Sequence, residues 1–168
     1  FTYKANDGSA DSNIASVSIT VTPQNDSPTT SPVTLAAILE DSGAHLITQA
    51  ELLANASDVD GDTLTLTNLA ISAGNGVLVD NLNGTWTYTP ASNDDTAVSF
   101  SYNVNDGSLT ASGLANLDLI PVNDAPTDAN LNISTLENTT YTGTLPVATD
   151  VEGDAINYTL SMGASHGI

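Results

Sequence analysis

Four short motifs occur twice in this chain, in the same order, at a period of about 95 to 99 residues, although the copies of the fourth motif are 92 residues apart. The pairs are FTYKANDGS and FSYNVNDGS at 1–9 and 100–108, PQNDSP and PVNDAP at 23–28 and 121–126, LEDS and LENT at 39–42 and 136–139, and DVDGD and DVEGD at 58–62 and 150–154. Repetition in a constant order indicates a tandem array of one structural unit. We therefore predict that residues 1–28 end one unit, 29–126 form a complete unit and 127–168 begin a third.

The complete unit has the sequence pattern of a β-sandwich. Short runs with strand character follow one another every 8 to 15 residues, with turn residues between them. Asn83-Gly84 and Asp106-Gly107 supply the positive φ angles that tight hairpins need. Strands are predicted at 34–38, 64–70, 77–79, 85–89, 97–104 and 114–121. The predicted fold class is all-β, with tandem immunoglobulin-like β-sandwich repeats, one complete and two partial.

Aromatic residues on the predicted strands are expected to form the core of the sandwich. Trp86 and Tyr88 lie on one face of their strand, and Phe100, Tyr102 and Val104 share a face of theirs. The alternative is an aromatic platform for sugar binding, which requires Trp86 to be exposed to solvent.

One segment departs from the β pattern. Thr48 and Glu51 have the spacing of a capping box, and good helix formers follow them, so a single helical turn is predicted there. The distance from the early Glu to the acidic loop is 18 residues in the complete unit and 13 in the third. The helical turn is therefore expected to be a peripheral insertion.

The charge and composition of the chain exclude several classes of partner. Twenty Asp and Glu residues stand against Lys4 as the only Lys or Arg, which gives a formal charge of -19. Such a field repels DNA and RNA, so no nucleic-acid partner is expected. The chain has no Cys, which excludes disulfides and thiolate zinc sites. It has no apolar run near the roughly 18 residues that a membrane helix needs, so no membrane insertion is expected.

The DVDGD motif requires something to neutralise its carboxylates. In an extended segment Asp58, Asp60 and Asp62 project to one side, so they repel one another unless a cation lies among them. Hard oxygen ligands on short, turn-forming segments suit Ca²⁺, and Gly61 lets the backbone fold around an ion. The spacing differs from that of an EF-hand, which has Gly at its sixth position and Glu at its twelfth. A solvated acidic turn is the alternative for the motif taken alone.

Catalysis by these carboxylates is not expected. Acid–base catalysis needs a pair of carboxyl groups in a cleft with separated pKa values, usually beside a nucleophile or an orienting cation. This chain has one Lys, and it repeats its acidic residues from unit to unit. The chain is therefore predicted not to be an enzyme.

The acidic loops occur together with two further features. An Asn-Asp-x-Pro motif stands at both unit boundaries, at 25–28 and 123–126, and Glu40 and Glu137 each lie about 12 residues into their units. This ordered set resembles the cadherin-like repeats of large bacterial surface proteins and adhesins, and the resemblance extends over the whole chain. It implies Ca²⁺ between successive domains, held by an early Glu, an acidic segment, the Asn-Asp linker and the Asp-x-Asp loop of the next domain.

Carried over by position, the resemblance implies two sets of Ca²⁺ ligands. For the junction ahead of the complete unit, the implied ligands are Asn25, Asp26, Asp58, Asp60 and Asp62. For the junction after it, they are Glu40, Asp94 or Asp95, Asn123, Asp124, Asp150, Glu152 and Asp154. Glu137 is expected to serve a further junction that this sequence does not contain.

The resemblance also implies a function. It is typical of a non-enzymatic extender, whose junctions are stiffened by Ca²⁺, in a long adhesin that is extracellular or on the bacterial cell surface. The expected partners are neighbouring repeats of the same chain, with cell-surface or polysaccharide ligands as further candidates. The alternative function is a carbohydrate-binding accessory module of a secreted polysaccharide-degrading protein, and its best candidate residue is Trp86.

Overall fold

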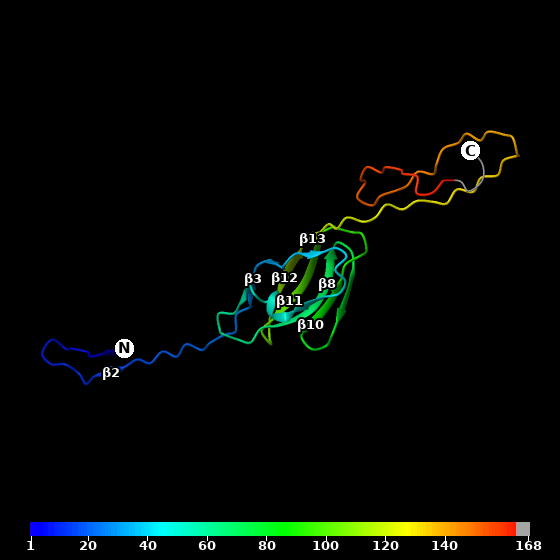
Figure 1. The fold of residues 1–168 in the computed structure, drawn as a ribbon. Coiled ribbons are helices and arrows are strands. Elements are labelled where there is room, and N and C mark those ends of the chain that lie inside the picture. The colour runs from blue at the N-terminus through cyan, green and yellow to red at the C-terminus, as the bar shows by residue number, and fades with distance from the viewer. Residues whose placement is uncertain (164–168) are drawn as a thin grey trace.

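Two β-sheets packed face to face form the centre of the computed structural model, which describes residues 1–163 (Figure 1). The first sheet has the strand order β4 (Val33–Thr34), β12 (Thr110–Leu117), β11 (Val98–Asn105) and β8 (Thr65–Ala73). The second has the order β6 (His45–Thr48), β10 (Thr85–Thr89) and β9 (Val77–Asp80). Residues 164–168, the end of the predicted third unit, lie outside the described residues.

The long hairpin β11–β12 shows why the sequence forms a sandwich. Every second residue of β11 is buried, and the residues between them are partly exposed, as expected for a strand with one face on a core. β12 pairs with β11 along its whole length, from Val98 opposite Leu117 to Asn105 opposite Thr110. The buried faces of both strands therefore point to the same side, toward β6 and β10.

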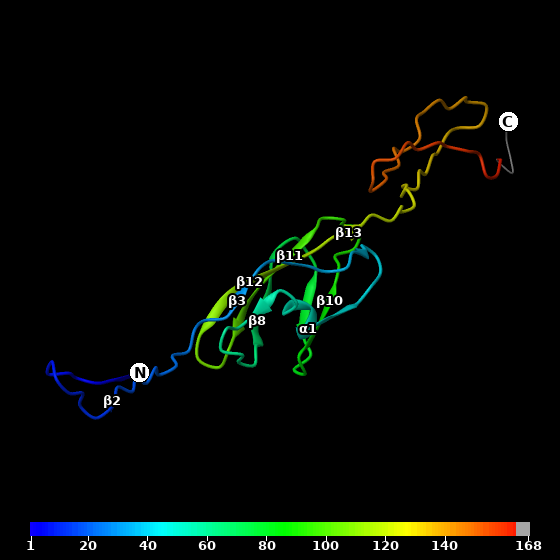
Figure 2. The ribbon, with the colours of Figure 1, turned by 90° about the vertical axis from the view of Figure 1, so that its left-hand side faces the viewer.

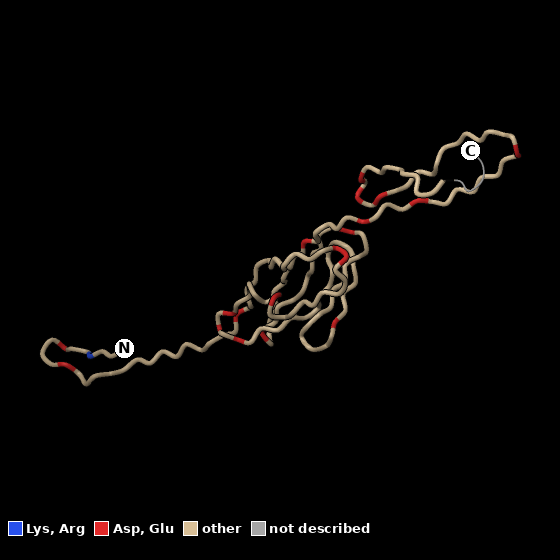
Figure 3. The backbone as a smooth tube through the Cα atoms, in the orientation of Figure 1, with Lys and Arg blue, Asp and Glu red and all other residues tan. Residues whose placement is uncertain are grey.

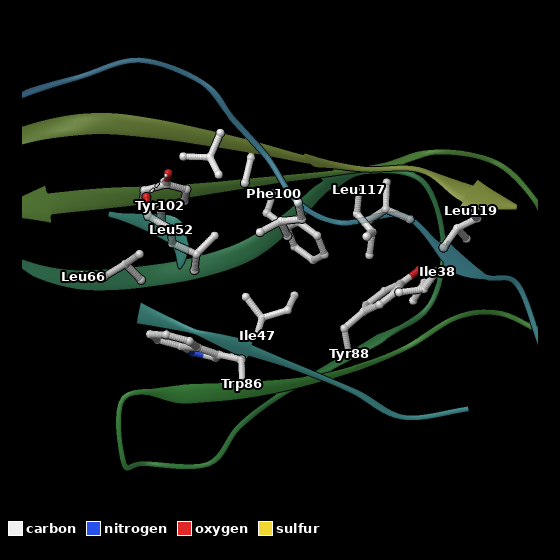
Figure 4. Packing of buried hydrophobic residues seen from close by; sticks show 14 of the residues in the cluster. Ile38, Ile47, Leu52, Leu66, Trp86, Tyr88, Phe100, Tyr102, Leu117 and Leu119 are labelled. Atoms are coloured by element: carbon white, nitrogen blue, oxygen red, sulfur yellow. Dashed lines mark hydrogen bonds between the residues drawn. The ribbon is translucent and has the colours of Figure 1, made fainter. Parts of the chain in front are cut away.

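The core between the sheets consists of the aromatic and aliphatic residues that the strand pattern predicted (Figure 4). Tyr88 and Phe100 pack edge to face across the sandwich, with their ring centroids 5.5 Å apart. The buried hydroxyl groups are satisfied, because Tyr88 Oη donates to the carbonyl of Asn75 and Tyr102 Oη to that of Leu52, each at 2.7 Å. The prediction that these aromatic residues form the core is confirmed, and it holds for Trp86 as well, which is 7% exposed.

Three further short structures accompany the two main sheets. The helical turn α1 (Gln49–Leu52) has the predicted capping box, in which Thr48 Oγ1 accepts from Glu51 N and Thr48 N donates to the Glu51 carboxylate. β5 (Ile38–Leu39) pairs in parallel with β13 (Leu119–Ile120). β3 (Thr29–Thr30) pairs in antiparallel with β7 (Ala56–Ser57).

Two extended segments leave the sandwich at opposite ends, as two views at right angles show (Figure 2). The N-terminal segment is a hairpin with β1 (Thr2–Tyr3) and β2 (Ala15–Ser16), closed by an ion pair of 3.5 Å between Lys4 and Asp11. The C-terminal segment folds back on itself through a bridge between Thr127 and Thr149. Most large apolar residues of both segments are exposed, so the packed core belongs to the central sandwich.

Candidate metal centres

Acidic segments lie at both ends of the sandwich, where the chain enters and leaves it (Figure 3). We call these two regions the N-terminal junction, built from residues 25, 26, 58–62 and 106, and the C-terminal junction, built from residues 40, 41, 93, 122–124 and 150–154.

At the N-terminal junction the linker is hydrogen-bonded to the DVDGD loop. Asp26 N donates to Asp60 Oδ2 at 2.8 Å, although 34 residues separate the two. Within the loop, Asp58 Oδ1 accepts from Asp60 N at 2.8 Å and from Asp62 N at 3.4 Å. The loop turns at Gly61, whose φ of 82° lies in the region that favours glycine. The structure thus brings the linker and the loop together as the resemblance implied.

A further carboxylate, Asp106, joins this junction from the β11–β12 turn. Asn25 Nδ2 donates to Asp106 Oδ2 at 3.0 Å. Asp106 Oδ1 also accepts from the backbone N–H groups of Leu109 and Ser108, at 2.7 and 2.6 Å. These hydrogen bonds lower the pKa of the Asp106 carboxyl group below its ordinary value. The bond from Leu109 N has the largest effect on the pKa, and the bond from Asn25 has a smaller one.

The lowered pKa of Asp106 gives a testable pH dependence. A carboxyl group whose pKa is depressed by folding stabilises the fold above its unfolded pKa of about 3.9, and this stabilisation is lost as the pH falls through the folded pKa. Carbon-detected NMR titration is expected to place the Asp106 pKa below about 3.9, and Asn25→Ala should raise it slightly. Asn13→Ala is the control, since Asn13 Nδ2 donates to a backbone carbonyl. An Asp106 pKa at or above the ordinary value would contradict the structure.

The C-terminal junction repeats this geometry one unit later. Asp124 N donates to Glu152 Oε2 at 3.3 Å, which corresponds to the bond from Asp26 to Asp60. Asp154 N donates to Asp150 Oδ1 at 3.0 Å. The loop again turns at a glycine with positive φ, Gly153. Asn123 Nδ2 donates to Asp124 O at 2.9 Å, just as Asn25 Nδ2 donates to Asp26 O at 3.1 Å.

The hydroxyl groups beside the two linkers also match. Thr29 Oγ1 lies 3.0 Å from Ser57 Oγ and 3.2 Å from Ser57 O. Thr127 Oγ1 lies 3.1 Å from Thr149 Oγ1 and 3.3 Å from Thr149 O. Each pair fastens a linker to the segment just before its acidic loop, so both linkers are held at two points.

Glu40 ties the sandwich to the C-terminal linker. It is the buried charged residue of the described chain, with 4% of its surface exposed, and its Oε1 accepts from Val122 N at 2.7 Å. The adjacent Asp41 accepts from Asn93 N at 3.3 Å through Oδ1. The early Glu, the acidic segment and the linker therefore meet at one end of the sandwich.

Not every implied ligand takes part in a junction. Asp94 accepts from Thr96 N and from Asn75 Nδ2, at 3.0 and 2.6 Å. Hydrogen bonds to Thr96 and then Asn75 lower the pKa of the Asp94 carboxyl group. Asp95 and Glu137 are exposed, and neither side chain has a hydrogen-bond partner within residues 1–163.

Two carboxylate oxygens are buried without a hydrogen-bond partner, and one lies at each junction. They are Asp58 Oδ2 and Asp124 Oδ2, and no other side-chain oxygen or nitrogen in residues 1–163 is in this state. A buried acceptor that lacks a donor costs about 1–3 kcal/mol, and more when it is charged, so such groups normally have a donor or a cation beside them. Both residues belong to the implied Ca²⁺ ligand sets, and carboxylate and amide oxygens are the donors that Ca²⁺ takes. The residues present therefore fit the ion.

The carboxylate oxygens of the junctions do not form a complete coordination site in this arrangement. In the part of the chain that the structure describes, no three Asp, Glu or His side chains converge closely enough to hold a metal ion. Backbone N–H groups satisfy Asp60 and Glu152 instead. Binding of an ion at either junction would therefore require the carboxylates to move closer together.

Two residues of the junctions were missed by sequence reasoning. The sequence pattern places Asp106 in a hairpin turn, and Asp41 belongs to neither implied set of ligands. A signal for Asp106 was present, because its NDGS motif recurs at residues 6–9 and therefore keeps its place in the repeat. Asp7 in the earlier copy accepts from Ser9 N and Ala10 N in the same way as Asp106 accepts from Ser108 and Leu109.

Comparison with known proteins decides the family. The family model described as a cadherin-like domain matches residues 24–119, which is more than half of the chain. The chain belongs to the cadherin-like domain family. Cadherin-like domains generally bind Ca²⁺ and are typical of extracellular proteins, and a domain of this kind fits an extender or adhesion module. The prediction of a cadherin-like β-sandwich is confirmed.

The solved structures that resemble this cadherin-like chain include two enzymes. They are the endo-fucoidan hydrolases MfFcnA9 and MfFcnA4 from glycoside hydrolase family 107, each 24% identical in sequence with a TM-score of 0.38. The matches cover 71% and 73% of this chain but only 22% and 19% of those proteins, so the chain spans about a fifth of their length. No curated protein matches the chain. Among its described residues, no helix is both long enough and apolar enough to cross a membrane.

Proposed function

We propose that this cadherin-like chain is a non-enzymatic extender of a large bacterial extracellular or cell-surface adhesin, with junctions that Ca²⁺ stiffens. The observation that carries the proposal is the pair of buried carboxylate oxygens without partners, Asp58 Oδ2 and Asp124 Oδ2. They lie one at each junction, in residues that the family resemblance assigns as ligands. The matching hydrogen bonds of the two junctions support the same role at both.

Hydrogen bonds within the chain would orient and anchor the linkers of this extender. The bonds from Asp26 N to Asp60 and from Asp124 N to Glu152 set the direction in which each linker leaves its acidic loop. The bond from Val122 N to buried Glu40 anchors the start of the C-terminal linker to the sandwich. Ca²⁺, when bound, would supply positive charge that cancels the repulsion among the carboxylates and links oxygens from both sides of a junction.

The alternative function of a sugar-binding platform is not favoured by the position of Trp86. Its indole is directed into the sandwich with 7% of the residue exposed, so it offers no open face for stacking (Figure 4). A role for the chain inside a polysaccharide-degrading protein therefore lacks its best candidate residue on the surface.

Calorimetric titration of the full chain with Ca²⁺ tests the proposal. We expect binding at both junctions, with Asp58→Ala abolishing it at the N-terminal junction and Asp124→Ala at the C-terminal junction. Extracellular modules bind Ca²⁺ with dissociation constants of about 10⁻⁴ to 10⁻³ M. The titration should therefore extend to a Ca²⁺ concentration of about 10 mM. Amide shifts of Gly61 and Gly153 in NMR spectra assign each binding event to its junction.

Asp80→Asn is the matched control for these variants. It removes one negative charge from the end of β9, outside both junctions, and should leave the number of bound ions unchanged. Wild-type protein that binds no Ca²⁺ in this range would overturn the proposal. Equal loss of binding in all three variants would show that Ca²⁺ responds to net charge alone.

A further inference from the structure

Two strands near the start of the sandwich, β4 and β5, pair in parallel with the strands that end it, β12 and β13. Val33 stands opposite Ala115 in the first pair, and Ile38 stands opposite Leu119 in the second. We give the name terminal ladder to four hydrogen bonds that join these strands and the residues just after them. They run from Leu35 N to Asn116 O at 2.8 Å, from Ile38 N to Asp118 O at 3.2 Å, from Glu40 N to Ile120 O at 3.1 Å, and from Val122 N to Glu40 Oε1 at 2.7 Å.

Glu40 provides the last acceptor of the terminal ladder with its side chain. In a regular parallel ladder the bond from Glu40 N to Ile120 O would be followed by one from Val122 N to the Glu40 carbonyl. Here Val122 N donates to the Glu40 carboxylate instead. The ladder therefore extends one step beyond β5 and β13, to the point where the C-terminal linker begins.

The bond between Val122 and Glu40 is also the shortest of the four. Glu40 is 4% exposed, so water competes little for its carboxylate. A hydrogen bond to an ionised group is about twice as strong as one between neutral groups. The last bond of the terminal ladder is thus expected to be its strongest.

The direction in which the chain leaves the sandwich determines how force acts on this ladder. The N-terminal and C-terminal segments leave at opposite ends (Figure 1, Figure 2). Because the paired strands are parallel, a pull on both segments draws β4 and β5 one way and β12 and β13 the other way. The strands are then forced to slide along each other, and the bonds of the ladder share the load. In a hairpin that is pulled open from one end, by contrast, the bonds break one after another.

A pull on the C-terminal linker reaches the bond from Val122 to Glu40 before the other bonds of the ladder. We propose that the terminal ladder resists mechanical force along the chain, and that the Glu40 carboxylate holds its C-terminal end. The inference deepens the proposed extender function and rests on it for the direction of the force. It gives Glu40 a role that needs no ion, in addition to its implied role as a Ca²⁺ ligand.

Single-molecule force spectroscopy of the full chain, in the presence of chelator, tests the proposal. The chain has no Cys, so a Cys added at each end provides defined points of attachment. Glu40→Ala deletes the acceptor of Val122 N, and Val122→Pro deletes the donor. Each is expected to raise the unfolding rate at constant force about tenfold, the effect of losing one hydrogen bond to a charged group. Because both changes break the same bond, the double variant should unfold no faster than either single variant.

Three control variants separate this hydrogen bond from other causes. Glu40→Gln removes the charge but keeps an oxygen that can accept from Val122 N, so it should recover most of the wild-type resistance to force. Val122→Ala keeps the N–H group and accounts for the lost side chain. Glu51→Ala is the matched control, because it also removes a carboxylate that accepts from a backbone N–H, that of Thr48, but outside the terminal ladder. It should lower stability toward urea with little change in the unfolding rate under force.

Several outcomes would overturn the proposal. Two of them are equal unfolding rates under force for wild-type protein and Glu40→Ala, and equal acceleration by Glu40→Ala and Glu51→Ala. Equal acceleration by Glu40→Ala and Glu40→Gln would assign the effect to charge, and additive effects of Glu40→Ala and Val122→Pro would show that the residues do not act through one bond. If circular dichroism shows that Val122→Pro is unfolded, the comparison of Glu40→Ala with Glu40→Gln and Glu51→Ala decides.

The force measurements and the Ca²⁺ titration can fail independently. All unfolding rates are measured without Ca²⁺, so they do not depend on whether the junctions bind the ion. Absence of Ca²⁺ binding in the titration would overturn the Ca²⁺-stiffened extender and leave the mechanical role of Glu40 standing. Loss of the difference between Glu40→Ala and its controls would overturn the mechanical role and leave the junctions unaffected.

Discussion

Removal of Ca²⁺ is expected to lower the melting temperature of this chain by about 10 °C or more. An ion with a dissociation constant of about 1 mM, present at about 10 mM, stabilises the folded state by about 1.4 kcal/mol through mass action, and two junctions double this figure. One kcal/mol corresponds to about 4–8 °C for a domain of 60–100 residues. Thermal unfolding followed by circular dichroism, once in about 10 mM CaCl₂ and once with a chelator, measures this difference in melting temperature.

Controls must separate a bound ion from simple screening, because a chain of charge -19 is stabilised by any salt. NaCl at equal ionic strength accounts for screening. Mg²⁺ accounts for divalent charge, since it gives up its water reluctantly and rarely occupies all-protein cages. The double variant Asp58→Ala/Asp124→Ala should lose the Ca²⁺-specific part of the shift. Identical melting curves in CaCl₂ and in NaCl would rule out Ca²⁺ as the junction ligand.

The strands that the sequence predicted best are those whose burial alternates without interruption. β10 occupies the predicted range 85–89, and β11 differs from its prediction by one residue at each end. The predicted strand 34–38 is instead divided into β4 and β5, which pair with different partners, β12 and β13. The division has a pattern behind it, because Val33, Leu35 and Ile38 are buried and the last spacing is three residues. A strand that changes partners cannot keep a period of two.

The start of β12 and the whole of β6 escaped prediction for other reasons. The residues 110–113 have almost no apolar side chains, and they form a strand because they pair with β11. Gly113 stands opposite Tyr102, whose ring occupies the space that a side chain at 113 would need. β6 is only four residues long, and it runs directly into the capping box that marked this region as helical. Both segments are strands because they pair with neighbouring strands, and their local sequence pattern does not indicate this.

In the candidate metal centres, too, some features could be predicted from the sequence and others could not. Repetition of the motifs located the linkers and loops, and the family resemblance implied that they meet, as Asp26 and Asp60 do. Asp106 reaches Asn25 across 81 residues of sequence, a contact created only by the fold of the hairpin. The β-bulge of β8, in which Asn68 and Leu69 stand opposite the single residue Tyr102, could not be predicted either, because it depends on the pairing of β8 with β11.

Gly76→Ala is expected to lower the free energy of unfolding by about 2–5 kcal/mol, the combined cost of a strained backbone and a crowded core. Gly76 connects β8 to β9 with a φ of 125°, outside the range that residues with a side chain adopt readily. A Cβ here would lie 2.6 Å from Cε2 of Tyr88 and 2.7 Å from Thr89 O. Neither neighbour can move freely, because Tyr88 is fully buried against Phe100 and the carbonyl belongs to β10.

Gly84→Ala separates the two causes. Gly84 has a φ of 81° in the turn before β10, but a Cβ there meets no atom within 4 Å, so only the backbone cost of about 1 kcal/mol remains. Urea unfolding of both variants in the presence of Ca²⁺ gives the comparison. Equal destabilisation would mean that the space around Tyr88 is less closely packed than the structure shows. A larger effect at Gly76 would show that close packing around Tyr88, beyond backbone strain, stabilises the sandwich.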